Sequence, residues 1–346
     1  MDASTLGKID IRGKDVREFL NRVYANAWTQ LAPGKCRYGL MLDENGMVFD
    51  DGVTACVADD HFLMTTTTGG AARVLTWLEK WHQTEWPDLD VYMTSVTDHW
   101  ATAAVVGPKS RQVLAKLCSD IDLSPASFKF MDWREATVAG VPARVFRISF
   151  SGELAFEINV DASYGHHIWE ALMDAGREFN ITPYGTETMH VLRAEKGFII
   201  AGQDTDGSMT PFDLDMSWAV SMKKPFSFIG KRSFTRSDTA KSDRKQLVGL
   251  LTDDPQVVLT EGAQMIETTD IKPPVPMFGH VTSSYFSPEL GRSIALAVVR
   301  DGIRRRSEDG VKAGRDIMYA WAGGKAHKVK IVSAVFVDPQ GARQNG

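Results

Sequence analysis

The spacing of apolar residues predicts alternating helices and strands in the first two thirds of the chain. Val16, Phe19, Leu20 and Val23 recur at helical spacing, which predicts an amphipathic helix opening Gly13–Trp28. Further helices are predicted after Gly69-Gly70, after Gly107-Pro108, over Tyr164–Phe179, and over Thr186–Lys196 with Gly197 as its end. Strands are predicted at Val48–Val57, Phe62–Thr67, Ala101–Val106 and across Val138–Val160, broken at Gly140 and Ser151-Gly152.

The last third has a different pattern. A polar stretch, Ser237–Lys245, has the composition of a linker. Short β-type runs follow it at Gln246–Leu251, Phe278–Ser283, Ile294–Val299 and Lys328–Phe336. The sequence therefore predicts an α+β part over residues 1–236 and an all-β domain over residues 237–346.

The segment Arg147–Val160 holds the most informative acidic residues. It places Glu153 and Glu157 in a run that otherwise reads as β-strand, with Phe156 and Ile158 on either side of Glu157. A buried carboxylate without a partner is costly, so Glu157 must face solvent or be held by another group. If it points into a cavity, it suits a flat ligand with adjacent N–H donors, such as a pterin ring.

Other acidic residues permit more than one interpretation. In a strand, one of Asp50 and Asp51 faces inward and the other outward, so either could hold an amine nitrogen or both could decorate a strand end. Glu195 is expected to form a local salt bridge. The run Asp204-Thr205-Asp206-Gly207 lacks the remaining acidic ligands of a calcium loop and is interpreted as a turn.

Composition narrows the class of protein. The net charge of −5 argues against a nucleic-acid partner, which leaves a basic footprint. No apolar window is long enough for a membrane span, and the N-terminus has no signal pattern, so we expect a cytoplasmic protein.

The three cysteines give no zinc spacing, and the histidines are scattered, so no metal site is expected. Dinucleotide, P-loop, zincin and nucleophile-elbow motifs are absent; Gly69-Gly70 is interpreted as a strand-to-helix turn.

The order of motifs resembles the folate-binding aminomethyltransferase family, which includes the glycine-cleavage T-protein. The matching segments are Cys36–Leu42, Gly46–Val53, Val106–Ser110, Ser151–Val160, Leu192–Asp206, Phe228–Lys231, Gly279–Leu296 and Phe336–Gly341. Within the family, segments such as FLMTTTTGGAARVL and TPYGTETMHVLRAEKGFI are similar to the sarcosine oxidase alpha-subunit branch. The resemblance implies a three-subdomain cloverleaf around a central folate cavity, with a C-terminal β-barrel.

The resemblance also implies site residues and a cofactor. The glutamate that holds the pterin of tetrahydrofolate falls on Glu157, and a tyrosine of some oxidase relatives is replaced by Phe150. The aspartate beside the folate amine nitrogens falls on Asp51. A different acid that serves T-proteins has no counterpart in Thr65–Leu75, and a T-protein arginine is replaced by Met189. The missing acid favours an oxidase-type site over glycine cleavage, and the replacement at Met189 leaves open which residues hold the folate tail.

Three functions follow from the resemblance. The first is a one-carbon transferase that captures formaldehyde or imine from N-methyl amine (sarcosine) oxidation as 5,10-methylenetetrahydrofolate, with Asp51 as base or electrostatic partner and Glu157 as anchor. A flavin-bearing oxidase subunit is then the expected partner, since the chain encodes no flavin or nicotinamide site. The second is a folate-binding scaffolding subunit without activity alone. The third is an RNA-modification or iron–sulfur factor, whose cysteine motif is missing at Lys196–Asp204.

Overall fold

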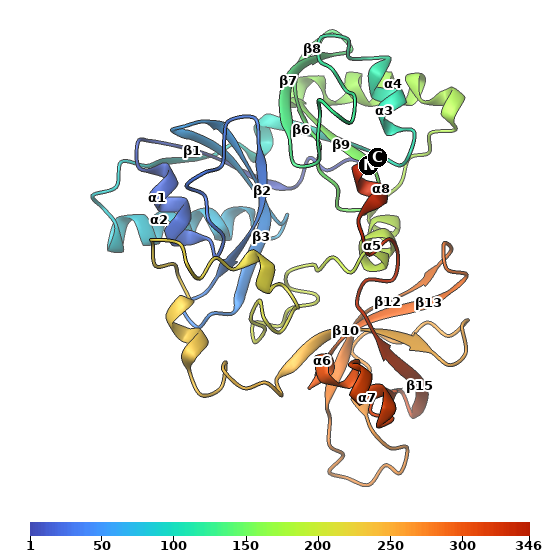
Figure 1. The fold of residues 1–346 in the computed structure, drawn as a ribbon. Coiled ribbons are helices and arrows are strands. Elements are labelled where there is room, and N and C mark those ends of the chain that lie inside the picture. Colours follow the sequence, from blue (N-terminus) through green and yellow to red (C-terminus); the bar gives the residue numbers. More distant parts are fainter.

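The computed structural model describes all 346 residues and divides the chain into three bodies around a common centre (Figure 1). The first body is an antiparallel sheet in the order β2-β3-β4-β1-β5 with two helices. Its elements are β1 (Gly7–Arg12), α1 (Val16–Val23), β2 (Cys36–Leu42), β3 (Val48–Ala58), β4 (His61–Thr66), α2 (Ala71–Glu85) and β5 (Tyr92–Ser95). The helical spacing at Val16–Val23 is confirmed, because its apolar side chains are fully buried against the sheet.

The second body is a four-stranded sheet in the order β6-β9-β8-β7. Its elements are β6 (Trp100–Val106), α3 (Ser110–Ala115), β7 (Trp133–Val138), β8 (Val141–Phe146), β9 (Ala155–Asp161) and α4 (Gly165–Ala175). Phe156, Ile158 and Val160 on β9 enter one hydrophobic core. Because side chains alternate along a strand, Ala155 and Glu157 face the opposite side of this sheet.

The third body is a closed antiparallel barrel in the order β10-β13-β12-β11-β14-β15. Its elements are β10 (Lys245–Thr252), β11 (Gln264–Ile266), β12 (Gly279–Ser287), β13 (Arg292–Arg300), α6 (Gly302–Arg305), α7 (Glu308–Lys312), β14 (Ile317–Ala322) and β15 (Lys325–Val332). Closure leaves no unpaired sheet edge. The predicted α+β class with a C-terminal β-barrel is confirmed.

The segment between the second body and the barrel joins all three bodies. Helix α5 (Thr186–Glu195) lies at the centre of the molecule (Figure 1), and Gly197 ends it with a left-handed φ of 72°. The chain then returns to the first body, where the Ile229 N–H donates to the Arg22 carbonyl. The buried Lys224 ammonium donates to the carbonyls of Tyr24 and Asn26. The first body therefore includes residues that lie far from it in sequence.

The C-terminal segment crosses from the barrel to the second body and ends in α8 (Ala342–Asn345), close to the N-terminus (Figure 1). The Lys196 ammonium bonds the Asp338 carboxylate at 3.1 Å, and both side chains are nearly buried. Arg343 bonds Glu153 at 3.1 Å and Glu289 at 2.6 Å. These ion pairs fasten residues Ser333–Gly346 across the gap between two bodies.

Two expectations from the sequence are wrong in detail. The predicted break at Ser151-Gly152 is present, with Gly152 at a left-handed φ of 77°. The break is longer than predicted, because all of residues 147–154 form a loop and the strand begins only at Ala155. Glu153 therefore lies outside the sheet. Glu195 has no basic residue within salt-bridge distance; its carboxylate accepts a hydrogen bond from the Ser287 hydroxyl at 2.6 Å, and burial raises its pKa.

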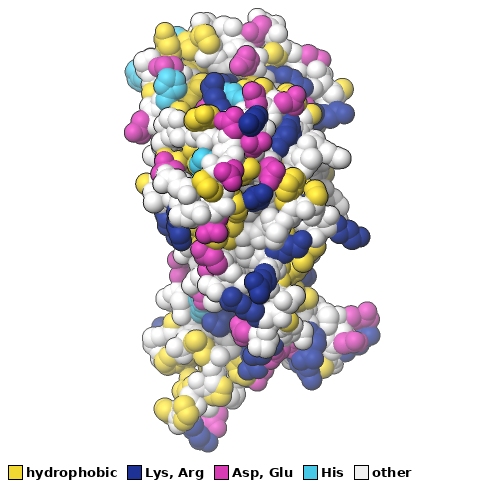
Figure 2. Space-filling view, turned by 90° about the vertical axis from the view of Figure 1, so that its left-hand side faces the viewer, with side chains coloured by type: hydrophobic (Ala, Val, Ile, Leu, Met, Phe, Trp, Pro, Cys, Tyr) yellow, Lys and Arg dark blue, Asp and Glu magenta, His cyan; other side chains and the backbone are white.

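One face of the molecule carries charges of both signs. Figure 2 shows Lys and Arg side chains interspersed with Asp and Glu on the face that it presents. None of the helices combines the length and the apolar content that a bilayer crossing requires.

A buried ion pair between α5 and the segment that follows it is hydrogen-bonded to the barrel. The Arg193 guanidinium bonds the Asp204 carboxylate, and both side chains are completely buried. The Ser283 hydroxyl of β12 accepts from Arg193 at 2.6 Å and donates to Asp204 at 2.9 Å. Asp204 is the last residue of a turn over residues 201–204, and its carboxylate links the segment after α5 to the barrel.

We expect Asp204→Asn to lower the free energy of unfolding by about 3–5 kcal/mol, because it leaves the buried Arg193 charge without a partner. Urea unfolding followed by tryptophan fluorescence measures this loss. The matched control is Asp243→Asn, which removes the partner of exposed Arg300 and should leave the midpoint almost unchanged. Equal effects of the two variants would contradict the assignment.

Candidate functional site

A cavity of about 1500 Å³ lies where the three bodies meet. Its lining comes from every part of the fold, and includes Tyr38, Asp51, Ala104, Glu157, Phe198, Trp218, Leu247 and Ser333. Binding cavities for small molecules typically measure about 300–1,000 Å³. The cavity is therefore large enough to hold a ligand and a second reactant together.

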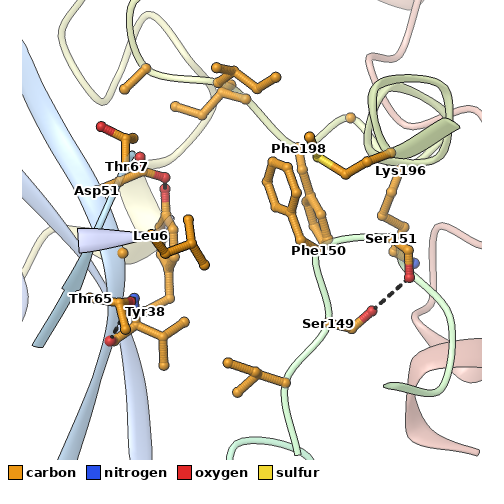
Figure 3. Close-up of a pocket in the computed structure, with 18 of the residues that line it drawn as sticks. Leu6, Tyr38, Asp51, Thr65, Thr67, Ser149, Phe150, Ser151, Lys196 and Phe198 are labelled. Atoms are coloured by element: carbon orange, nitrogen blue, oxygen red, sulfur yellow. Dashed lines mark hydrogen bonds between the residues drawn. The ribbon is translucent and has the colours of Figure 1, made fainter. Parts of the chain in front are cut away.

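The first body supplies a polar wall built on β2 and β3. Asp51 faces the cavity, and the Tyr38 hydroxyl donates to its Oδ2 at 2.7 Å (Figure 3). Asp50 faces the other way and is fully buried. Its carboxylate accepts from the Thr67 N–H at 3.0 Å and the Thr67 hydroxyl at 2.8 Å. One member of the Asp50-Asp51 pair thus supports the backbone and the other is free to contact a ligand.

The same arrangement explains Gly69-Gly70. A Cβ atom at position 70 would lie 2.0 Å from Asp50 Oδ2, so only glycine lets this carboxylate approach the turn before α2. The interpretation as a strand-to-helix turn is confirmed. The segment Thr65–Leu75, which lacks an acid, contributes threonines and Arg73 to the cavity wall.

The pKa of Asp51 reflects its position. Burial raises the pKa of its carboxyl from 3.8 to about 7, and the hydrogen bond from Tyr38 acts in the opposite direction. The charge of neighbouring Asp50 raises it further. Near neutral pH, Asp51 can therefore exchange a proton with a bound molecule, which suits a general acid or base.

Glu157 lies on β9 in the wall supplied by the second body, opposite Ala104 of β6 in the strand register. No protein group donates a hydrogen bond to its carboxylate, and burial raises its pKa to about 7. The buried Lys8 ammonium offsets part of this effect through its charge. A carboxylate that is desolvated, unpartnered and open to the cavity is a ready acceptor for ligand N–H groups.

The wall facing Asp51 is aromatic. Figure 3 shows Phe150 and Phe198 side by side across the cavity from Tyr38 and Asp51. Their ring centroids lie 6.2 Å apart with an interplanar angle of 20°. Phe150 remains 38% exposed because it projects into the open cavity. Such rings can pack against a flat ligand.

Three lining residues were missed at the level of sequence. Tyr38 and Trp218 pack together with ring centroids 5.9 Å apart. The third is Tyr184, whose own burial, together with the charge of nearby Glu157, raises its pKa to about 12. Tyr38 lies two residues into a predicted motif and could have been noticed from its strand periodicity. Trp218 lies in an irregular segment, where periodicity gives no signal. Met189 also lines the cavity.

No group of three or more His, Cys, Asp or Glu side chains is arranged to hold a metal ion. The candidate chemistry of the site therefore rests on Asp51, Glu157, the tyrosine hydroxyls and the aromatic wall.

Comparisons with protein families give two matches that follow one another along the chain. The GCVT N-terminal domain matches residues 1–224, and the glycine cleavage T-protein C-terminal barrel domain matches residues 245–338. The aminomethyltransferase of Bartonella henselae superposes with a TM-score of 0.81 at 23% identity, covering 98% of this chain and 86% of that one. The aminomethyltransferase-like fold is confirmed.

Curated relatives fall into two groups. The sarcosine oxidase alpha subunits of Corynebacterium sp. (strain U-96) and Rhizobium meliloti are 54% and 43% identical over 100% and 99% of this chain. The chain spans only 35% and 34% of their lengths. The aminomethyltransferase of Thermotoga petrophila is 30% identical, covering 97% of this chain and 85% of the relative.

Because the pKa of Glu157 is raised, ionisation of this residue should lower the free energy of unfolding of the ligand-free protein. Because the folded state holds this proton more tightly than the unfolded chain, stability falls as pH rises from about 4.5 to about 7. Glu157→Gln should therefore exceed the wild type in stability by about 1–3 kcal/mol at pH 8, and match it at pH 4. Urea unfolding at both pH values measures this, with Glu135→Gln on the exposed face of β7 as the control outside the cavity. A variant that is less stable at pH 8 would contradict the prediction.

Proposed function

This chain belongs to the aminomethyltransferase family of the glycine-cleavage T-protein, and from this we propose that it is a tetrahydrofolate-binding one-carbon transferase. We infer further that it captures formaldehyde, or the imine formed when an N-methyl amine such as sarcosine is oxidised. The product is 5,10-methylenetetrahydrofolate.

The observation that carries the proposal is the Glu157 carboxylate, which is desolvated and unpartnered in the cavity wall. A reduced pterin presents adjacent N–H groups along one edge, and a carboxylate can accept two of them through its two oxygens. The stacked rings of Phe150 and Phe198 supply an apolar surface for the flat parts of the same ligand. The residues present therefore suit tetrahydrofolate.

The two carboxylates would have different roles. Tetrahydrofolate supplies two nitrogens that together take up the carbon, while its two N–H protons and the formaldehyde oxygen leave as water. Glu157 would orient the pterin by accepting hydrogen bonds. Asp51 would accept a nitrogen proton and stabilise the positive charge that develops beside it. A carboxyl group whose pKa lies near 7 can take up and release that proton at neutral pH.

The cavity also supports a bimolecular reaction. Its volume of about 1500 Å³ admits an acceptor and a small electrophile together, and holding both raises their effective concentration. We propose that a flavin-bearing oxidase supplies the electrophile. Support comes from the sarcosine oxidase alpha subunits, whose matching region is about one third of their length.

Binding is the first test. We expect folinic acid, a stable reduced folate, to bind the chain in calorimetry, and Glu157→Ala to bind it at least about ten-fold more weakly, since a hydrogen bond to a charged group contributes roughly 1.5–3 kcal/mol. Glu135→Ala, on the exposed face of β7 and outside the cavity lining, should bind as the wild type does. A well-folded wild type that does not bind would refute the proposal.

Transfer is the second test. Asp51→Asn should lower the rate of methylene transfer by about 100-fold or more while folinic acid binding is retained, because the base is lost and the anchor is not. The rate is measured from formaldehyde and tetrahydrofolate, coupled to a methylenetetrahydrofolate dehydrogenase, after subtraction of the reaction without protein. Asp59→Asn on the exposed surface is the control. Equal, low rates in the wild type and Asp51→Asn would instead favour a scaffolding subunit.

A further inference from the structure

Tyr38 makes the one hydrogen bond that the Asp51 carboxylate receives from another side chain. Tyr38 lies on β2, opposite Val53, and Asp51 lies two residues along β3, opposite Leu40. This diagonal cross-strand position brings the hydroxyl to 2.7 Å from Asp51 Oδ2. Both groups line the cavity, and the contact is drawn in Figure 3.

We propose that Tyr38 is a positioning residue for the one-carbon transfer: its hydroxyl favours the ionised form of Asp51 and leaves the second carboxylate oxygen directed into the cavity. The proposal rests on the proposed function for its catalytic meaning. Its physical part, the coupling between Tyr38 and the Asp51 proton, is independent of any substrate.

Tyr38 can act only as a donor toward Asp51. Burial raises the Tyr38 pKa well above its usual value, and the adjacent Asp51 charge raises it further, so the hydroxyl stays protonated. A donor to one carboxylate oxygen stabilises the ionised form and leaves the other oxygen open. Asp51 thereby keeps a lower pKa than burial alone would give.

The other groups around Asp51 do not supply this effect. Asp50, its neighbour on β3, raises the Asp51 pKa by its negative charge. Arg73 of α2 lies 3.6 Å from the Asp50 carboxylate and donates to the Phe49 carbonyl. Tyr24, after α1, directs its hydroxyl to Thr54 at 2.9 Å. Tyr38 is therefore the group that opposes protonation of Asp51.

Trp218 fixes the Tyr38 ring. Its indole packs on the tyrosine with centroids 5.9 Å apart and an interplanar angle of 34°, although Trp218 as a residue is 70% exposed. Tyr38→Phe keeps this ring contact and removes only the hydroxyl. The substitution thus separates the hydrogen bond from the packing of the wall.

The test is a titration of Asp51 by ¹³C NMR in protein labelled at the aspartate carboxyl carbon, with the signal assigned through Asp51→Asn. In Tyr38→Phe we expect the Asp51 carboxylate to bind its proton about 10- to 100-fold more tightly than in the wild type. Since transfer requires the ionised form, the acidic limb of the transfer rate should move to higher pH by the same factor. At high pH the transfer rate of Tyr38→Phe should return to that of the wild type. The KM for tetrahydrofolate should be the same in both proteins.

Tyr24→Phe is the matched control, because it removes a buried hydroxyl from the same body without touching Asp51. The pKa of Asp51 measured in Tyr24→Phe should equal that in the wild type. An unchanged titration in Tyr38→Phe, or an equal shift in both variants, would overturn the proposal. A shifted titration in a chain without transfer activity would support the coupling and refute the proposed function.

Discussion

The geometry of the cavity depends on one buried ion pair. Arg193 and Asp204 are both removed from water, and the hydroxyls of Thr282 and Ser283 on β12 add hydrogen bonds from the barrel. Because a buried charge tolerates the loss of its partner poorly, the relative position of α5 and the barrel is closely defined. The segments that follow α5 supply Phe198 and Trp218 to opposite sides of the cavity. A substitution of Arg193 or Asp204 would therefore displace Phe198 and Trp218 in the cavity wall, although neither residue of the ion pair lines the cavity.

Local periodicity predicted the parts of the site that lie on regular strands. The alternation of side chains correctly predicted that Asp50 and Asp51 face opposite ways. It also identified Glu157 as a carboxylate that must face solvent or be held by another group, and Glu157 lines the cavity. The helix at Val16–Val23 and the C-terminal β-strands follow the same logic. The roles assigned to Asp51, Glu157 and Phe150 came from the family resemblance and remain predictions.

What could not be predicted depends on contacts between distant segments. The Tyr38–Asp51 bond requires the register of β2 and β3, which is set by the turn between them. Glu195 was assigned a salt bridge from its basic sequence neighbours, but the fold places Ser287 against it. Residues 147–154 contain strand-forming side chains, yet a left-handed Gly152 and the ion pair of Glu153 with Arg343 hold them in a loop. Tertiary contacts override local preference in each case.

The last residues of the chain are also part of the cavity wall. Ser333, Ala334, Val335 and Gln344 line it, and Lys196 and Arg343 fasten the segment that carries them. During synthesis, these residues leave the ribosome after every other wall residue. A nascent chain can thus fold its first two bodies before it has a closed cavity. The chain therefore cannot enclose a ligand before all three bodies and the segment Ser333–Gln344 have been made.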